Sequence, residues 1–279
     1  MPPKRGRPPA HGGSSGSAGA IVAQSTPIPS VHRELVQNAG TKCGLVQTLK
    51  SLHQAGLLSD AALGGSAKNV KRKLQTAIEA HAKTQTPYGK VVKTMRVDLP
   101  DMQFWEYCDP MALIWHLCNI SPAFADVMAA CVTPGVPLRI VIYVDECEPG
   151  NPYRPEKSRC LQCIYWCFAD WPQWLVPRTA AWPVFGVMTS SHTSLLPGGL
   201  ADLMRRVLLT FFPSTGHSFL RGICIQRGDR HMHTMIKAIF AGFLADEKAH
   251  KELGDLKGAS GSNLYGLVCA VVGGASSVG

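Results

Sequence analysis

Residues 138–146 read Leu138-Arg139-Ile140-Val141-Ile142-Tyr143-Val144-Asp145-Glu146, and this stretch decides the fold class of the 279-residue chain. The run is rich in β-branched residues and is bounded by Pro137 on one side and by 149–151 (Pro-Gly-Asn) on the other, which is typical of a strand between two turns. Because the apolar, branched residues of 138–144 do not alternate regularly with polar ones, the run predicts a central strand that is buried on both faces.

The segments downstream of this strand predict the rest of a sheet. Two aromatic-rich strands, one helix, a short extra strand and an apolar run follow in that order: 162–168, 182–189, 198–212, 219–226 and 235–245. Upstream, 109–120 predicts a helix with Asp109 as its cap and Pro110 in its first turn. The order indicates an α/β domain with a mixed sheet and flanking helices, in which 239–244 lies parallel and adjacent to 138–144.

Two aspartates end apolar runs of this predicted sheet, Asp145 in Val-Asp-Glu and Asp246 in Ala-Asp-Glu. Three strands, a helix and a further strand between two carboxylates is the order of a ribonuclease H-like sheet, in which the two acids meet at neighbouring strand ends. Two such acids would hold Mg²⁺, which prefers oxygen ligands, and would support in-line displacement at phosphorus. The alternative is that both are ordinary turn residues, with Asp246 capping the helix predicted for 246–256.

A short basic motif at the N-terminus, Lys4-Arg5-Gly6-Arg7-Pro8, reads as an AT-hook. Glycine lets the backbone approach the floor of the narrow minor groove of A·T-rich DNA, and the flanking prolines keep both arginines extended along it. Charge is distributed accordingly, since residues 1–96 hold 14 of the 28 lysines and arginines but three of the 19 acidic residues. The predicted partner is therefore A·T-rich duplex DNA, although a solubilising basic arm has the same composition.

Composition divides the chain into four parts. Residues 1–30 predict a disordered AT-hook arm, 31–85 a basic helical region, 86–262 the α/β domain, and 263–279 a flexible or aberrant tail. Helices are expected at 31–39, 44–55 and 67–82; the last carries Lys71, Arg72 and Lys73, which would contact DNA in a helix-turn-helix unit or simply face solvent. Ten cysteines without an apolar leader indicate a reducing compartment, and with the hook they predict a nuclear location without membrane association.

Other chemistries have weaker patterns. Cys160-x-x-Cys163 lacks a second pair at zinc-finger spacing, and its neighbours read as a buried strand. His231-Met232-His233 follows a predicted turn and favours a surface loop. The chain has no Gly-x-Ser-x-Gly elbow, and His192 and His217 have no nucleophile beside them in sequence, which argues against a hydrolase.

The stretches 88–92, 137–155, 162–174 and 242–261 resemble a multicopy family of predicted proteins in dinoflagellate genomes, so the resemblance covers 86–261. The Asp-Glu-x-x-Pro-Gly turn at 145–150 and the segment 245–249 (Ala-Asp-Glu-Lys-Ala) are also similar to eukaryotic DDE transposases of the Plavaka and CACTA kind. That resemblance implies that Asp145 and Asp246 bind metal.

The chain departs from this pattern at its C-terminal end. DDE enzymes use a third acid on a later helix, and only Glu247, Glu252 and Asp255 follow Asp246. The sequence therefore predicts a DNA-associated protein derived from a transposase, with an incomplete ribonuclease H-like domain and weak or lost phosphoryl transfer. The alternative is a non-enzymatic, DNA-tethered scaffold.

Overall fold

The computed structural model describes residues 41–63, 70–99, 102–147, 160–227, 232–245, 249 and 252–253. Its helices are α2 (Thr41–Gln54), α3 (Val70–Lys83), α4 (Pro110–Ile120), α5 (Pro122–Cys131), the 3₁₀ turn η3 (Thr179–Ala181), α6 (Ser190–Leu195) and α7 (Gly199–Phe211). Its strands are β1 (Gln85–Thr86), β2 (Gly89–Lys90), β3 (Val92–Leu99), β4 (Met102–Cys108), β5 (Leu138–Cys147), β6 (Leu161–Phe168), β7 (Val184–Thr189), β8 (Ile223–Arg227), β9 (Met232–Ile236) and β10 (Ala238–Leu244).

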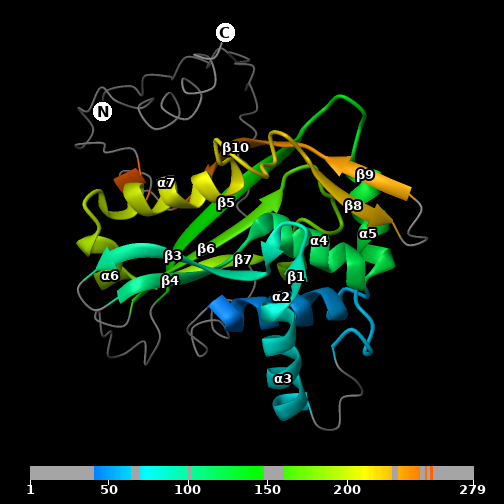
Figure 1. The fold of residues 1–279 in the computed structure, drawn as a ribbon, viewed down its shortest axis with the longest axis horizontal. Helices are drawn as coiled ribbons and strands as arrows, with labels where there is room; N and C mark the ends of the chain where they lie inside the picture. The colour runs from blue at the N-terminus through cyan, green and yellow to red at the C-terminus, as the bar shows by residue number, and fades with distance from the viewer. Residues whose placement is uncertain are drawn as a thin grey trace, which may run out of the picture.

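A four-stranded mixed sheet with the order β10-β5-β6-β7 forms the centre of the molecule (Figure 1). The last strand, β10, runs parallel to β5 with Ile239 opposite Arg139 and Leu244 opposite Tyr143, whereas β6 is antiparallel to both β5 and β7. The predicted mixed α/β architecture and the parallel pairing of 239–244 with 138–144 are therefore confirmed.

The prediction that the 138–144 strand is buried on both faces is wrong. Along β5, Ile140, Ile142 and Val144 are buried, whereas Arg139 is exposed and Tyr143 is half-buried. One face of β5 packs against the helices, and on the other face Arg139 reaches outward to form an ion pair of 2.7 Å with Asp170. The strand that is buried on both faces is β6, whose eight residues are all buried.

Helix α4 begins as its sequence predicts. Asp109 accepts a hydrogen bond of 2.9 Å from the backbone N–H of Ala112, and Pro110 occupies the first helical position, where its missing N–H costs nothing. The same carboxylate forms a 2.7 Å ion pair with Lys93 of β3. This cap therefore also fixes α4 against the β3–β4 hairpin.

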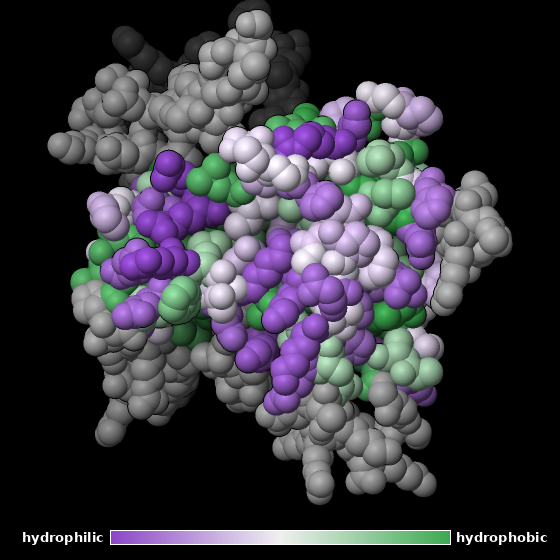
Figure 2. All heavy atoms as spheres, viewed as in Figure 1, coloured by the Kyte–Doolittle hydropathy of each residue, from purple (hydrophilic) through white to green (hydrophobic). Residues whose placement is uncertain are grey.

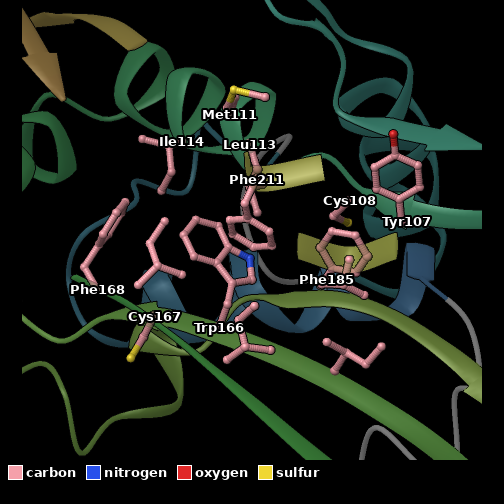
Figure 3. Close-up of a cluster of buried hydrophobic side chains, with 14 of the residues drawn as sticks. Tyr107, Cys108, Met111, Leu113, Ile114, Trp166, Cys167, Phe168, Phe185 and Phe211 are labelled. Atoms are coloured by element: carbon pink, nitrogen blue, oxygen red, sulfur yellow. The ribbon is translucent and has the colours of Figure 1, made fainter. Parts of the chain in front are cut away.

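The core lies between α4, α7 and the inner face of the sheet (Figure 3). Trp166 of β6 is at its centre and makes edge-to-face contacts with Phe168 and with Phe211 of α7, at ring-centroid distances of 5.5 and 5.2 Å. Helix α7 contributes one apolar stripe, comprising Leu200, Leu203, Met204, Val207, Leu208 and Phe211. The aromatic residues of 162–168 thus serve as core.

Three antiparallel two-stranded pairs outside the central sheet, β1–β2, β3–β4 and β8–β9, were not predicted as such. The segment predicted as a short added strand, 219–226, contributes β8, which pairs with β9. Met232 and His233 belong to β9 and not to a surface loop, and His233 lies opposite Gln226.

Both described helices of the N-terminal region pack onto this domain. Leu45, Leu49 and Leu52 of α2 belong to the same hydrophobic cluster as the sheet. Gly44 lies so close to β7 that an added Cβ would be 2.6 Å from Cβ of Val184. The predicted helices at 44–55 and 67–82 are confirmed as α2 and α3; the one expected at 31–39 lies outside the described residues.

Candidate functional site

The carboxyl end of β5 presents two acids to different surroundings. Asp145 pairs with Cys163 of β6, and Glu146 pairs with Gln162. Because successive side chains of a strand point to opposite faces, Asp145 and Glu146 cannot both lie on the same face of the sheet. Each acid therefore has its own set of neighbours.

A small pocket opens at this end of the sheet. Its lining consists of Val144, Asp145, Glu146, Gln162, Leu200, Ala249 and Glu252. The cavity volume is about 20 Å³, which is the size of one water molecule or one ion and far below that of a metabolite site. Three acidic residues thus line a pocket of ionic size, and Glu146 is the one of the two β5 acids that shares a face with Gln162.

Glu146 is held in this pocket by a hydrogen-bonded relay. The hydroxyl of Ser190, the first residue of α6, donates to Glu146 Oε1 at 2.6 Å, and Gln162 Nε2 donates to the same hydroxyl at 3.3 Å. Ser190 is also tied to the sheet through its backbone N–H, which donates to Cys160 O at 2.8 Å. The relay therefore restricts where the Glu146 carboxylate can lie.

Asp145 shares its surroundings with sulfur and phenol groups. Burial raises the pKa of Tyr165 most, and the nearby groups of Cys163, Cys147 and Asp145 raise it further. Tyr165 therefore stays protonated across the physiological pH range. Asp145 is half-buried between this cluster and the pocket.

The second predicted acid, Asp246, lies outside the described residues. The last described pair of the parallel ladder is Leu244 and Tyr143, and Asp246 and Asp145 each follow two positions later in the sequence. Of the later acids, Glu252 lines the pocket, whereas Glu247 and Asp255 are outside the described residues. Helical spacing could have indicated Glu252, but the position of its helix could not be read from sequence.

The donor chemistry of the pocket suits Mg²⁺, because carboxylate oxygens and the amide of Gln162 are the ligand types that this ion prefers. In the described part of the chain, however, no three His, Cys, Asp or Glu side chains are close enough to hold one metal ion. The Cys160-x-x-Cys163 motif is likewise not part of any such group of ligating side chains in the described residues. The donor types at the pocket thus suit Mg²⁺, but the described residues do not by themselves assemble a complete set of ligands.

Of the predicted DNA contacts, Lys4, Arg5, Gly6, Arg7 and Pro8 are outside the described residues. Lys71, Arg72 and Lys73 belong to the first turns of α3, and their side chains are likewise not described. Hydrophilic residues gather around α3 and along α7 on the face shown in Figure 2.

A groove of about 280 Å³ lies between α2, α3, β2 and β4, and it is lined by three lysines and two glutamates: Lys42, Lys83, Lys90, Glu79 and Glu106. Lys42 contacts Glu106 at 3.3 Å, and Lys83 contacts Glu79 at 3.9 Å. Because the glutamates neutralise two of the lysines, this groove is not a continuous basic track.

A pair of histidines, the half-buried His81 and the buried His116, joins α3 to α4. His81 Nε2 donates to the carbonyl of Ala62 at 3.0 Å, so in the neutral ring Nδ1 of His81 accepts the Nε2–H of His116 at 2.8 Å. Burial, and then the neighbouring His81, lowers the pKa of His116 to about 4. Burial also lowers the pKa of His81, against the effect of the Ala62 carbonyl. The pair is therefore neutral at pH 7.

His192, considered above for hydrolase chemistry, accompanies a helix cap. Thr189 Oγ1 accepts the backbone N–H of His192 at the start of α6 and contacts His192 Nδ1 at 2.7 Å.

Among the described helices, none is long and apolar enough to cross a membrane. No family model, curated protein or solved structure matches the chain.

Proposed function

We propose that this chain is a nuclear, DNA-associated protein derived from a DDE-type transposase, with a ribonuclease H-like sheet that lacks a full catalytic centre. The parallel pairing of β5 with β10 carries the proposal, because it places Asp145 near the carboxyl end of a central strand and the strand that precedes Asp246 beside it. The strand order supports it further: three consecutive antiparallel strands are followed by helices, by the separate β8–β9 hairpin and then by a strand beside the first.

The pocket at this strand end supports a divalent cation as the ligand. Glu146, which shares a face with Gln162 and is oriented by Ser190, and Glu252 would supply carboxylate oxygens, and Asp145 lines the same pocket from the end region of β5. A bound Mg²⁺ would polarise a phosphoryl oxygen and activate a water or a 3′-hydroxyl there. The residues themselves would position the ion and exclude bulky ligands, since the cavity has ionic size.

Weak chemistry is expected from this set. Oxygen ligands that do not close around an ion hold it loosely, and in-line displacement needs both the attacking and the leaving oxygen to be stabilised. We therefore expect metal binding with little or no DNA cleavage.

DNA binding is assigned to the N-terminal arm and to α3. The arm carries the arginines of the AT-hook motif, and α3 carries its basic residues in its first turns, remote from His81 and Ala82, which pack against the domain. This arrangement would leave the basic end of α3 for phosphate contacts. The mixed charge of the α2–α3 groove argues against DNA running through it.

A DNA-tethered scaffold without enzymatic activity is the second candidate. The described residues favour it in one respect, because they contain no three acidic or metal-ligating side chains arranged around one ion. The two candidates share the DNA-binding arm and differ only in the pocket.

Equilibrium binding of the full chain to A·T-rich and G·C-rich duplexes of equal length tests the DNA assignment. The unmodified chain should prefer the A·T-rich duplex, and affinity should fall steeply with salt. Replacing Arg5 and Arg7 by alanine should remove the preference but leave residual binding through residues 33–96. Arg221→Ala is a matched control, because that guanidinium is engaged by three backbone carbonyls of its own loop. Equal binding of both duplexes by the unmodified chain would contradict the assignment.

A further inference from the structure

Two cysteines meet on the face of the sheet behind the carboxylate pocket. Cys147 is the last residue of β5 and pairs with Leu161, and Cys163 of β6 pairs with Asp145 two residues away. Residues two apart in register lie on the same face of an antiparallel pair, so the two side chains are diagonal neighbours. The strand register alone therefore brings their sulfur atoms together.

The side-chain contacts agree with the register. The Cys147 and Cys163 side chains are close enough to interact with each other. They belong to one small hydrophobic cluster together with Leu161, Tyr165 and Val184, in which Cys147 is 5 % and Cys163 is 1 % exposed. Both are thiols in this structure.

We propose that Cys147 and Cys163 form a redox pair, which closes to a disulfide when the protein meets a hydroperoxide. Hydrogen peroxide first oxidises one thiol to a sulfenic acid and releases one water. The second thiol then attacks that sulfur, a sulfur–sulfur bond forms, the sulfur–oxygen bond breaks, and a second water leaves. Two thiols thus lose two protons and two electrons, and the peroxide is reduced to two waters.

Proximity decides which cysteines pair. A disulfide needs its sulfur atoms at about 2.0 Å and its Cα atoms within roughly 7 Å. Diagonal neighbours on adjacent strands lie about 7–8 Å apart, so closing the bond would draw the end of β5 toward β6 by a small backbone shift. A hydroperoxide is small enough to reach these two buried thiols, whereas a bulky disulfide reagent would not reach them. Cys167 is the natural comparison, because it is a buried cysteine on the same face of β6 and pairs with Val141.

The disulfide would covalently join the carboxyl end of β5 to β6, next to Asp145 and Glu146. It would therefore restrain the strand end that forms one wall of the pocket. This inference does not depend on DNA or metal binding, since it rests only on the register and contact of the two thiols.

Peptide mapping of the full chain tests the pair. The protein is fully reduced, treated with hydrogen peroxide, alkylated with iodoacetamide and digested without reductant. Mass spectrometry should then find peptides joined through Cys147 and Cys163, lighter by two hydrogens than the separate thiol peptides and separated by dithiothreitol. The oxidised protein should unfold about 5–10 °C higher than the reduced protein.

Two serine variants refine the assignment. Cys163→Ser should lose the cross-linked peptide, whereas Cys167→Ser should retain it. The wild-type map decides by itself if a variant fails to fold. Recovery of Cys147 and Cys163 in alkylated or sulfinic form, or a disulfide between another pair such as Cys160 and Cys163, would overturn the proposal.

Discussion

Leu244 of β10 lies opposite Tyr143 of β5 in a parallel ladder, and this pairing places a strand from the C-terminal part of the chain beside the central strand. The sequence separation between the two residues is about one hundred positions, so the contact depends on the packing of everything between them. Because this pairing depends on the packed core, the free energy of unfolding should depend on the buried face of β5, which carries Ile140, Ile142 and Val144.

Ile142→Ala tests that dependence. Ile142 is fully buried, so its truncation should lower the free energy of unfolding by about 2–5 kcal/mol through lost burial and a residual cavity. Ile239→Ala, in the neighbouring strand, is the matched control, because Ile239 is 41 % exposed and should cost less than about 1 kcal/mol. Urea denaturation measures both, and similar losses would contradict the assigned faces.

A second substitution tests the docking of α2 onto the sheet. Gly44→Ala would place a methyl group 2.6 Å from Cβ of Val184, so α2 must shift away from β7. We expect a loss of about 1–3 kcal/mol, as for other overpacked sites. Gly242→Ala has no atom within 4 Å of the added Cβ and should be close to neutral. If the two variants have the same thermal midpoint, α2 does not pack as described.

The histidine pair predicts acid sensitivity. The folded-state pKa of His116 is about 4 and lies below its ordinary value near 6.5, so the folded state binds fewer protons than the unfolded state between these values. The stabilisation is complete above pH 6.5 and is lost as pH falls toward 4, with a total of about 3 kcal/mol. His116→Asn should flatten the dependence of unfolding free energy on pH in this window. An unchanged slope in the variant would refute the neutral-pair assignment.

Ser190→Ala tests the relay that orients Glu146. Removing the 2.6 Å hydrogen bond weakens the restraint on the orientation of the Glu146 carboxylate, so Mn²⁺ affinity should fall by roughly two- to fivefold, with little change in stability. Ser194→Ala is the control, because that hydroxyl donates within α6 to the carbonyl of Ser191. Electron paramagnetic resonance of Mn²⁺ measures the affinities, and equal losses in both variants would mean that the relay has no part in metal binding.

Much of the sheet was predictable from sequence because its strands are long, apolar and bounded by turn residues. The 138–144 strand, the two antiparallel strands β6 and β7 that follow it and the parallel 239–244 strand all follow from such patterns. The β3–β4 hairpin was not predicted, since Lys93, Thr94 and Arg96 interrupt its apolar residues with side chains that face solvent or pair with acids. Burial on both faces was predicted for β5, but it is β6, with its aromatic residues, that is buried on both faces.

The candidate site was only partly predictable. Asp145 could be identified because a strand-end acid follows a clear strand. Glu146 and Ser190 are 44 residues apart, and their contact depends on how α6 follows β7, which no local pattern specifies. Glu252 was one of three candidates for a third acid, and its position at the pocket follows from the packing of Ala249 and Leu253 against the core.

Titration of Mn²⁺ into the full chain tests the central claim most directly. The account predicts measurable binding that weakens in Asp145→Asn, Asp246→Asn and Glu252→Gln but not in Asp126→Asn, whose carboxylate lies on α5 and does not line the pocket. The same samples should show little or no Mg²⁺-dependent cleavage of duplex DNA. Identical affinities in the wild type and Asp145→Asn would contradict the claim and leave the strand-end acids as structural turn residues.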